Sequence, residues 1–178
     1  MFERFTRAAK DVVRGAAEAA ERRGDAWVTE EHLVLVLLAG QGTRAADALA
    51  ALGVDRAAVE RELDAARQRG GLSKSDAEAL AGIGIDVAEI VGRVEEAHGA
   101  GVLGAQPRGR RWRDGRFDQG AKKVLERSLK VALGRGDKQI GDEHLLLALL
   151  SAPGPAAEVL ADQGAGYGDV ERVLRKAA

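Results

Sequence analysis

Two stretches of the chain end in unbroken apolar runs. Residues 29–38 and 141–150 each start with a short acidic turn, continue with Glu-His-Leu and end in Leu, Val and Ala. A helix without a polar face is packed on all sides, so each stretch is predicted to be the central helix of a small bundle. At about 1.5 Å of rise per residue, such a stretch covers about half of a bilayer core, so no membrane span is predicted.

The region before the first apolar run has the pattern of an amphipathic helix. From Phe2 to Arg23, apolar residues recur at intervals of three and four, with Arg, Lys and Glu between them. Thr6 is predicted to cap this helix and Gly24 to end it. A short helix over 43–52 and a further one after Asp55 complete the predicted unit.

The second half of the chain repeats the landmarks of the first. Three pairs lie 112 positions apart: Phe5 with Phe117, Gly24 with Gly136 and His32 with His144. After a one-residue deletion, four pairs lie 111 apart: Leu49 with Leu160, Gly53 with Gly164, Val59 with Val170 and Leu63 with Leu174. Agreement at this many positions indicates an internal duplication. The predicted fold is therefore all-α, with two four-helix repeats (1–70 and 116–178) related by a pseudo-twofold axis.

The segment between the repeats, 71–115, is predicted to be a helical insert followed by an Arg-rich linker. Residues 80–86 echo residues 49–55, and a helix over 87–98 places its aliphatic residues on one side. A connection of this length without structure is uncommon, so the insert is expected to pack on the bundle.

Composition narrows the possible classes of protein. The chain is 46% hydrophobic but only 3% aromatic, which favours a helical core of Ala, Leu and Val. Because it has no cysteine, disulfides and thiolate metal sites are excluded. The first residues do not have the pattern of a signal peptide, so a cytoplasmic location is expected. A net charge of −1 does not favour general nucleic-acid binding.

Several short motifs resemble one known family. Met-Phe-Glu-Arg-Phe-Thr at 1–6, the two Glu-His-Leu helices and Ala-Lys-Lys-Val-Leu-Glu at 121–126 resemble the N-terminal repeat domain of Clp unfoldases, in particular the ClpC type. The resemblance covers nearly all of both repeats but not the insert. It implies an all-helical, non-enzymatic module that receives substrates and adaptors for a protein-unfolding ATPase. No Gly-x-x-x-x-Gly-Lys-Ser/Thr sequence occurs, so we expect a recognition module without the motor.

The resemblance also implies a first set of ligand-binding residues. In ClpC relatives the domain binds phosphorylated arginine, and Glu31 and Glu143 align with the carboxylates that hold the guanidinium. A carboxylate can accept two parallel N–H bonds from this group. Thr6 and Arg4 complete the predicted set. The alternative is that both glutamates only complement the dipoles of their helices.

Three acidic residues depart from the family pattern. Asp118 stands where the second repeat should match Thr6, and Glu30 and Asp142 replace the threonine that usually precedes each glutamate. Added carboxylates disfavour a nearby phosphate dianion. We therefore expect phosphoarginine binding to be weakened or lost, most clearly in the second repeat, and plain arginine or a basic degron to fit better.

A second set of residues aligns with the surface that binds cyclic-peptide antibiotics in actinobacterial relatives. Aromatic side chains beside a Lys and a Glu can form an apolar hot spot with a polar edge. The alternative is that the aromatic residues are ordinary core residues at helix starts. The predicted surface comprises Phe2, Lys10, Val13, Phe117, Lys122 and Glu126.

Other motifs favour neither catalysis nor a cofactor. His32 and His144 are predicted to bond across their own turns, because no third metal ligand lies at helical spacing. The Gly-rich segment 99–104 follows a predicted helix rather than a strand, so a dinucleotide site is not expected. No nucleophile has an obvious base, so an enzyme is not expected.

Two further questions stay open at the level of sequence. The Arg-rich segment 108–116 contains Trp112 and could bind a nucleic-acid strand, although such a run is more often a solvated linker. The expected partners are components of the Clp unfoldase and protease or their substrates. The chain could serve as an adaptor that recruits substrates or as a decoy that competes for them.

Overall fold

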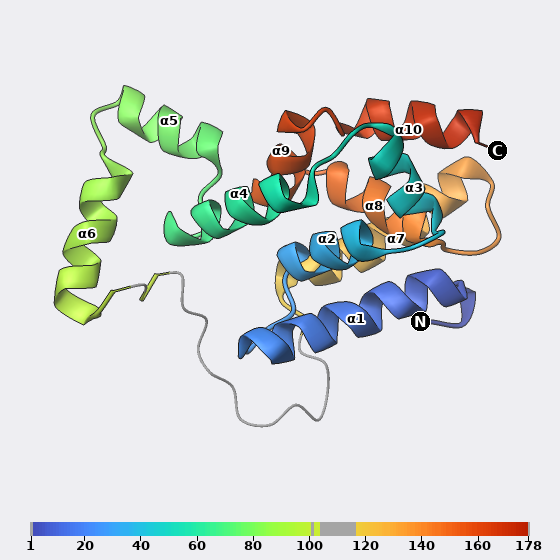
Figure 1. Cartoon of the computed structure of the whole chain (residues 1–178), viewed down its shortest axis with the longest axis horizontal. Coiled ribbons are helices and arrows are strands. Elements are labelled where there is room, and N and C mark those ends of the chain that lie inside the picture. Colours follow the sequence, from blue (N-terminus) through green and yellow to red (C-terminus); the bar gives the residue numbers. More distant parts are fainter. Residues whose placement is uncertain (1, 101, 104–116, 178) are drawn as a thin grey trace.

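The regular elements of the described chain are helices (Figure 1). The computed structural model describes residues 2–100, 102–103 and 117–177. The first part contains η1 (Phe2–Arg4), α1 (Arg7–Arg23), α2 (Glu30–Ala39), α3 (Arg44–Ala51) and α4 (Arg56–Gln68). The insert contains α5 (Lys74–Gly82) and α6 (Val87–His98). The last part contains α7 (Gln119–Arg135), α8 (Asp142–Leu150), α9 (Pro155–Asp162) and α10 (Tyr167–Lys176). No strand occurs in these ranges, and the all-α prediction is confirmed.

The helices of the two repeats correspond at the offsets that the sequence predicts. Helices α7 and α8 begin 112 positions after α1 and α2, and α9 and α10 begin 111 positions after α3 and α4. The first helices also end alike, because Gly24 and Gly136 adopt left-handed φ angles of 74° and 78°. Each repeat therefore builds the same four-helix unit. No observation tests the boundaries at 70 and 116, and these stay predictions.

Two short parallel pairings join the repeats across the pseudo-twofold axis. Phe5 pairs with Ile140, and Val28 pairs with Phe117. The N–H of Thr6 donates to the oxygen of Ile140 at 2.9 Å, and the N–H of Asp118 donates to that of Val28 at 2.9 Å. Because each pairing is the 112-residue image of the other, the start of each repeat's first helix lies beside the segment before the other repeat's central helix.

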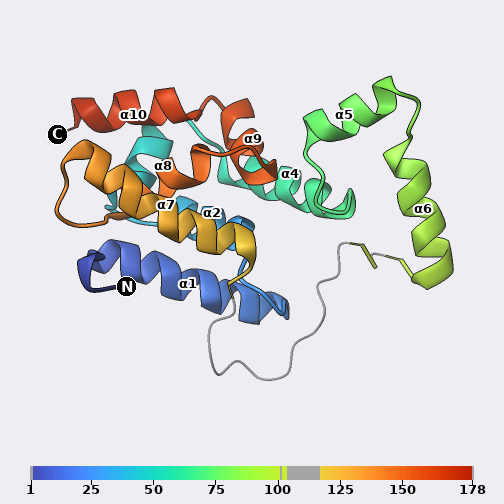
Figure 2. The same cartoon turned by 180° about the vertical axis from the view of Figure 1, so that it is seen from behind.

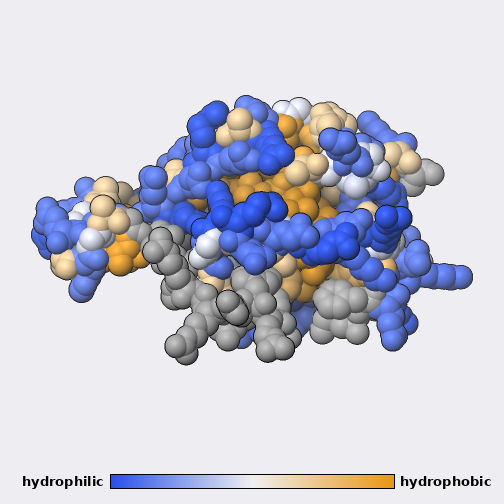
Figure 3. All heavy atoms as spheres, turned by 60° about the horizontal axis from the view of Figure 1, so that its bottom comes forward, coloured by the Kyte–Doolittle hydropathy of each residue, from blue (hydrophilic) through white to orange (hydrophobic). Residues whose placement is uncertain are grey.

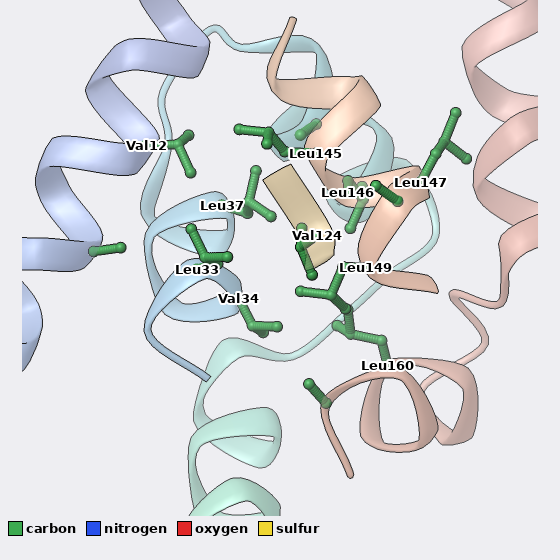
Figure 4. Packing of buried hydrophobic residues seen from close by; sticks show 14 of the residues in the cluster. Val12, Leu33, Val34, Leu37, Val124, Leu145, Leu146, Leu147, Leu149 and Leu160 are labelled. Carbon is green, nitrogen blue, oxygen red and sulfur yellow. The ribbon is translucent and has the colours of Figure 1, made fainter. Parts of the chain in front are cut away.

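The core is built around the two central helices, α2 and α8 (Figure 4). In α8, every residue from Asp142 to Leu149 is buried. In α2, Leu33, Val34 and Leu37 are buried, whereas the residues between them are half-buried. The prediction of a central, fully packed helix is thus confirmed for α8 and holds for one side of α2.

The insert was expected to pack on the bundle, but it does not. Helices α5 and α6 contain no buried residue and project from the body (Figures 1 and 2). Ile83 and Ile90 are 74% and 49% exposed. The prediction was wrong because α3 and α4 contact α2 while α9 and α10 contact α8, so both central helices already have their covering pair. Hydrogen bonds from Ser75 to Glu158 of α9 hold the start of α5 near the body, at 2.8 and 3.0 Å.

Two other expectations concern the membrane and the Arg-rich segment. Within the described ranges, none of the helices has by itself the length and apolar character to cross a bilayer, whereas the bent pairs α2 with α3 (81°) and α8 with α9 (99°) meet that criterion together. The segment 108–116, including Trp112, lies outside the described residues. The prediction that this segment could bind nucleic acid therefore stays a prediction.

Candidate functional site

Two pockets lie where the repeats meet, and each is built from both of them. The first, of about 430 Å³, is lined by Glu30 and Glu31 at the start of α2, Arg67 of α4, Asp118 before α7 and the loop before α9. The second, of about 470 Å³, is lined by the corresponding start of α8, by Thr6 before α1 and by the start of α3. The pseudo-twofold axis thus produces two related pockets with an acidic pair in each.

The structure combines the predicted site residues across the repeats. Thr6 lies in the second pocket with Glu143, and Asp118 lies in the first pocket with Glu31. Both are helix caps: Thr6 Oγ1 accepts from the N–H of Ala9 at 3.2 Å, and Asp118 Oδ1 accepts from that of Ala121 at 2.7 Å. Aspartate replaces threonine here because both side chains accept this bond well. Arg4 is exposed and is not among the described residues that line either pocket.

In the first pocket, Glu31 is held by two arginines of its own repeat. Arg67 donates to Glu31 Oε2 from Nη2 at 3.0 Å and from Nε at 3.3 Å, and Arg23 bonds to the other oxygen. Arg67 also bonds to Asp25, with Nη2 2.9 Å from Oδ2 and Nη1 3.3 Å from Oδ1. Burial lowers the pKa of Arg67, but hydrogen bonds to Asp25 and the charge of Glu31 outweigh it and raise that pKa above its usual value.

The histidines support the turns in front of the central helices. His32 Nδ1 accepts from the N–H of Thr29 at 3.0 Å, and His144 Nδ1 accepts from that of Gly141 at 2.8 Å. With Nδ1 as the acceptor, the ring proton lies on Nε2, which donates to Asp25 at 3.0 Å in the first repeat and to its counterpart, Asp137, at 2.9 Å in the second.

The role predicted for both histidines, bonding across their own turns, is therefore confirmed. Burial lowers the pKa of His32 and favours its neutral form. Among the described residues, no group of three or more His, Cys, Asp or Glu is placed to hold a metal ion.

In the second pocket, Glu143 is paired with a single arginine from the other repeat. Arg44 Nη1 lies 2.8 Å from Glu143 Oε1, and the Arg44 side chain is 46% exposed, compared with 23% for Arg67. The neighbouring Asp142 Oδ2 accepts from the N–H of Ala45 at 2.7 Å and so completes the cap of α3. This bond explains why an acidic residue stands at position 142.

Glu30 is the counterpart of Asp142, but its surroundings differ. Its Oε1 lies 3.7 Å from Arg127 Nη2, a distance at which the two charges attract without a close hydrogen bond. Burial raises the pKa of Glu30; Arg127 lowers it and Asp118 raises it. Partial desolvation and the nearby Asp118 therefore make Glu30 easier to protonate than an exposed glutamate.

The predicted cyclic-peptide surface is only partly assembled. Val13 and Phe117 are half-buried and pack against the core, whereas Lys10, Lys122 and Glu126 are exposed. Phe2 lies in η1, and its side chain is outside the described part of the chain. The predicted residues thus divide into two that pack on the core and three that face solvent.

One exposed stripe on α7 was not found from the sequence. Leu129 and Leu133 are 37% and 58% exposed and continue the face of Lys122 and Glu126 at helical spacing. Figure 3, which turns the lower side of the molecule forward, shows hydrophobic residues gathered between hydrophilic ones. The sequence signal was the placement of Leu129 and Leu133, four positions apart, on the same helix face as the charged residues Lys122 and Glu126.

Other contributors to the pockets were also missed. Asp25 and Asp137 could have been found, because both lie seven positions before a histidine and 112 positions apart. Arg67 and Arg44 could not be found by comparing the repeats. Arg44 corresponds to Pro155, and Arg67 corresponds to the last alanine of the chain.

Comparison with known proteins gives a consistent assignment. The profile of the Clp repeat (R) N-terminal domain matches residues 4–80 and 116–178. The chain is 35% identical over 178 residues to the chloroplastic ClpA homolog of the ATP-dependent Clp protease ATP-binding subunit from Brassica napus and to chaperone protein ClpC1, chloroplastic, from Arabidopsis thaliana. Each alignment covers 98% of this chain but only 16% and 15% of the relative, so the chain spans about one sixth of their length.

A solved structure agrees in fold. The N-terminal domain of the caseinolytic protease associated chaperone ClpD from Arabidopsis thaliana matches with a TM-score of 0.54 and 18% identity, over 99% of this chain and 96% of that one. Its fold is that of the two-repeat helical structure described above. The chain belongs to the Clp repeat (R) N-terminal domain family.

Proposed function

We propose that this chain is a non-enzymatic recognition module of the Clp proteolysis system that binds arginine-bearing segments of polypeptides at the acidic starts of its central helices, between the repeats. Family membership supports the general role. The observation that carries the ligand class is that Glu143 already binds a guanidinium, that of Arg44, at 2.8 Å. A carboxylate in this setting suits an arginine of a substrate equally well.

Unmodified arginine is the preferred ligand in this proposal. The first pocket is lined by three carboxylates, those of Glu30, Glu31 and Asp118, against the single cation of Arg67. A phosphate dianion would meet like charges there, which costs binding free energy. The second pocket is also lined by three carboxylates, those of Asp137, Asp142 and Glu143, but against two cations, Arg44 and Lys138. Any residual phosphoarginine binding therefore belongs to the second pocket, the reverse of the order expected from the sequence.

A second binding mode is favoured by the exposed stripe of α7. Leu129 and Leu133 next to Lys122 and Glu126 form an apolar strip with a polar edge, which suits a hydrophobic cyclic peptide. In either mode the chain acts as an adaptor or as a decoy for Clp components or their substrates. An adaptor accelerates degradation by a Clp unfoldase and protease, and a decoy slows it.

Calorimetric titration of the whole chain with matched peptides tests the ligand class. The peptides differ at one position, which is arginine, phosphoarginine or lysine. We expect the arginine peptide to bind most tightly, because only unmodified arginine offers the planar fork without a phosphate. Glu143→Gln should weaken it about tenfold or more, as expected when one charge-assisted pair is lost.

The control is Glu18→Gln, which removes an exposed carboxylate of α1 outside both pockets. It should leave the affinity unchanged. Tighter binding of the phosphoarginine peptide, or equal loss in both variants, would contradict the proposal.

A further inference from the structure

The side chain of Arg67 has the contacts that a bound arginine ligand would have. Its guanidinium lies between two carboxylates, with Nη2 2.9 Å from Asp25 and 3.0 Å from Glu31. Both acids are largely buried, since the side chains of Asp25 and Glu31 are 7% and 14% exposed. Charge-assisted bonds of this kind are strong where water is scarce.

An incoming arginine would meet an occupied carboxylate in the first pocket. Arg67 bonds to one oxygen of Glu31 and Arg23 to the other. Displacing Arg67 would leave Asp25 without its guanidinium, although His32 would still donate to it at 3.0 Å. Leaving a buried carboxylate without its cation is costly.

The second pocket is closed much less firmly. Arg44 makes one short bond to Glu143, and nearly half of its side chain is exposed. On release, the Arg44 side chain would pass into water with little loss, because nearly half of it is already exposed, whereas Glu143, which is 6% exposed, would still need a cation. An arginine ligand would then take the place of Arg44 on the same oxygen.

We propose that Arg67 and Arg44 are internal ligands of unequal strength, so that the second pocket accepts arginine while the first is held closed. This inference rests on the proposed function for the identity of the ligand. It makes Arg67 the residue that sets the number of working sites. The wild-type chain binds one arginine peptide at the Glu143 site, and removal of Arg67 opens a second site at Glu31.

Calorimetry with a peptide that carries a single arginine measures the number of sites. We expect one site in the wild type and two in Arg67→Ala. The control, Arg61→Ala, removes an exposed arginine from the same helix and should leave one site. Two equal sites in the wild type, or one site in a folded Arg67→Ala, would overturn the inference while the proposed function stands.

The strength of the other internal ligand is tested at the Glu143 site. Arg44→Ala should tighten binding about two- to fivefold, because the half-exposed Arg44 no longer competes with the ligand for Glu143. Lys138→Ala is the matched control, because it removes the same charge from the same pocket without a bond to Glu143. Equal tightening in both variants would show a general charge effect and would overturn the role of Arg44.

A readout that does not depend on peptide binding uses ethylguanidinium. Millimolar ethylguanidinium should raise the melting temperature of Arg67→Ala by filling the vacated space between Asp25 and Glu31, and should not raise that of Arg61→Ala. If no variant binds the peptide but this rescue occurs, the proposed function fails and Arg67 stands as an internal ligand. If the rescue is absent, Arg67 is not one.

Discussion

The two pockets are images of one another, yet a different arginine pairs with the glutamate in each of them. In the first, Arg67 comes from the same repeat, reaches two carboxylates and is 23% exposed. In the second, Arg44 comes from the other repeat, reaches one carboxylate and is 46% exposed. The duplicated framework therefore preserves the position of the acidic helix starts, while single side chains around them decide how accessible each one is.

The framework itself differs little between the repeats. Each has a histidine between a backbone N–H and an aspartate, and each first helix is capped from the segment that pairs with the other repeat. These bonds fix where the carboxylates lie.

The largest expected difference between the pockets is in the free energy of unfolding that is lost when the arginine of each pocket is removed. Arg67→Ala should lower the free energy of unfolding by about 3 kcal/mol, because it leaves two largely buried carboxylates without their cation. Arg44→Ala should cost less, about 1 to 2 kcal/mol, because it leaves one buried carboxylate, Glu143, rather than two without a cation. Urea denaturation of the two variants beside the wild type measures both. Equal losses would mean that the two arginines do not differ as the geometry indicates.

A smaller expected effect is the loss of stability of the folded chain at mildly acidic pH. Because burial lowers the pKa of His32, the folded chain takes up its proton at lower pH than the unfolded chain does. The unfolded state therefore binds more protons just below the usual histidine pKa of about 6.5, and the free energy of unfolding falls as the pH falls through that region. The stabilisation that comes from neutral, buried His32 should be fully present above about pH 6.5.

The measurement is the free energy of unfolding between about pH 5 and pH 7, where one such group contributes at most about 1.4 kcal/mol per pH unit. His32→Gln should flatten the profile. His98→Gln is the control, because His98 is exposed at the end of α6. A profile that stays steep in His32→Gln, or that flattens in His98→Gln, would assign the dependence to other groups.

Much of the framework could be predicted from sequence. The 112-residue offset identified the repeats, and the position of His32 and His144 before apolar runs indicated their structural role. The repeat offset and the position of each histidine can both be read from a single sequence, because the first depends only on recurring residues and the second only on neighbouring ones. The capping role of Thr6 was predicted for the same reason.

Three features could not be predicted, for physical reasons. Thr6 of the first repeat lies in the pocket of Glu143, and Asp118 of the second repeat lies in the pocket of Glu31. This arrangement depends on how the two repeats pack against each other, which the spacing of residues within one repeat does not show. Arg67 and Arg44 correspond to an alanine and a proline in the other repeat, so comparison of the repeats does not reveal them. The amphipathic pattern of α6 shows that it has an apolar side but not whether the body has a free face to receive it.

The central claim, that acidic pockets between the repeats bind arginine in polypeptides, is tested most directly by mapping amide chemical shifts of the whole chain during titration with the single-arginine peptide. We predict saturable shifts at Gly141, Glu143 and Arg44 in the wild type, with Glu31 and Arg67 unaffected, and shifts at Glu31 only once Arg67 is replaced. Shifts confined to α7 or the insert, or none with arginine, would contradict the claim.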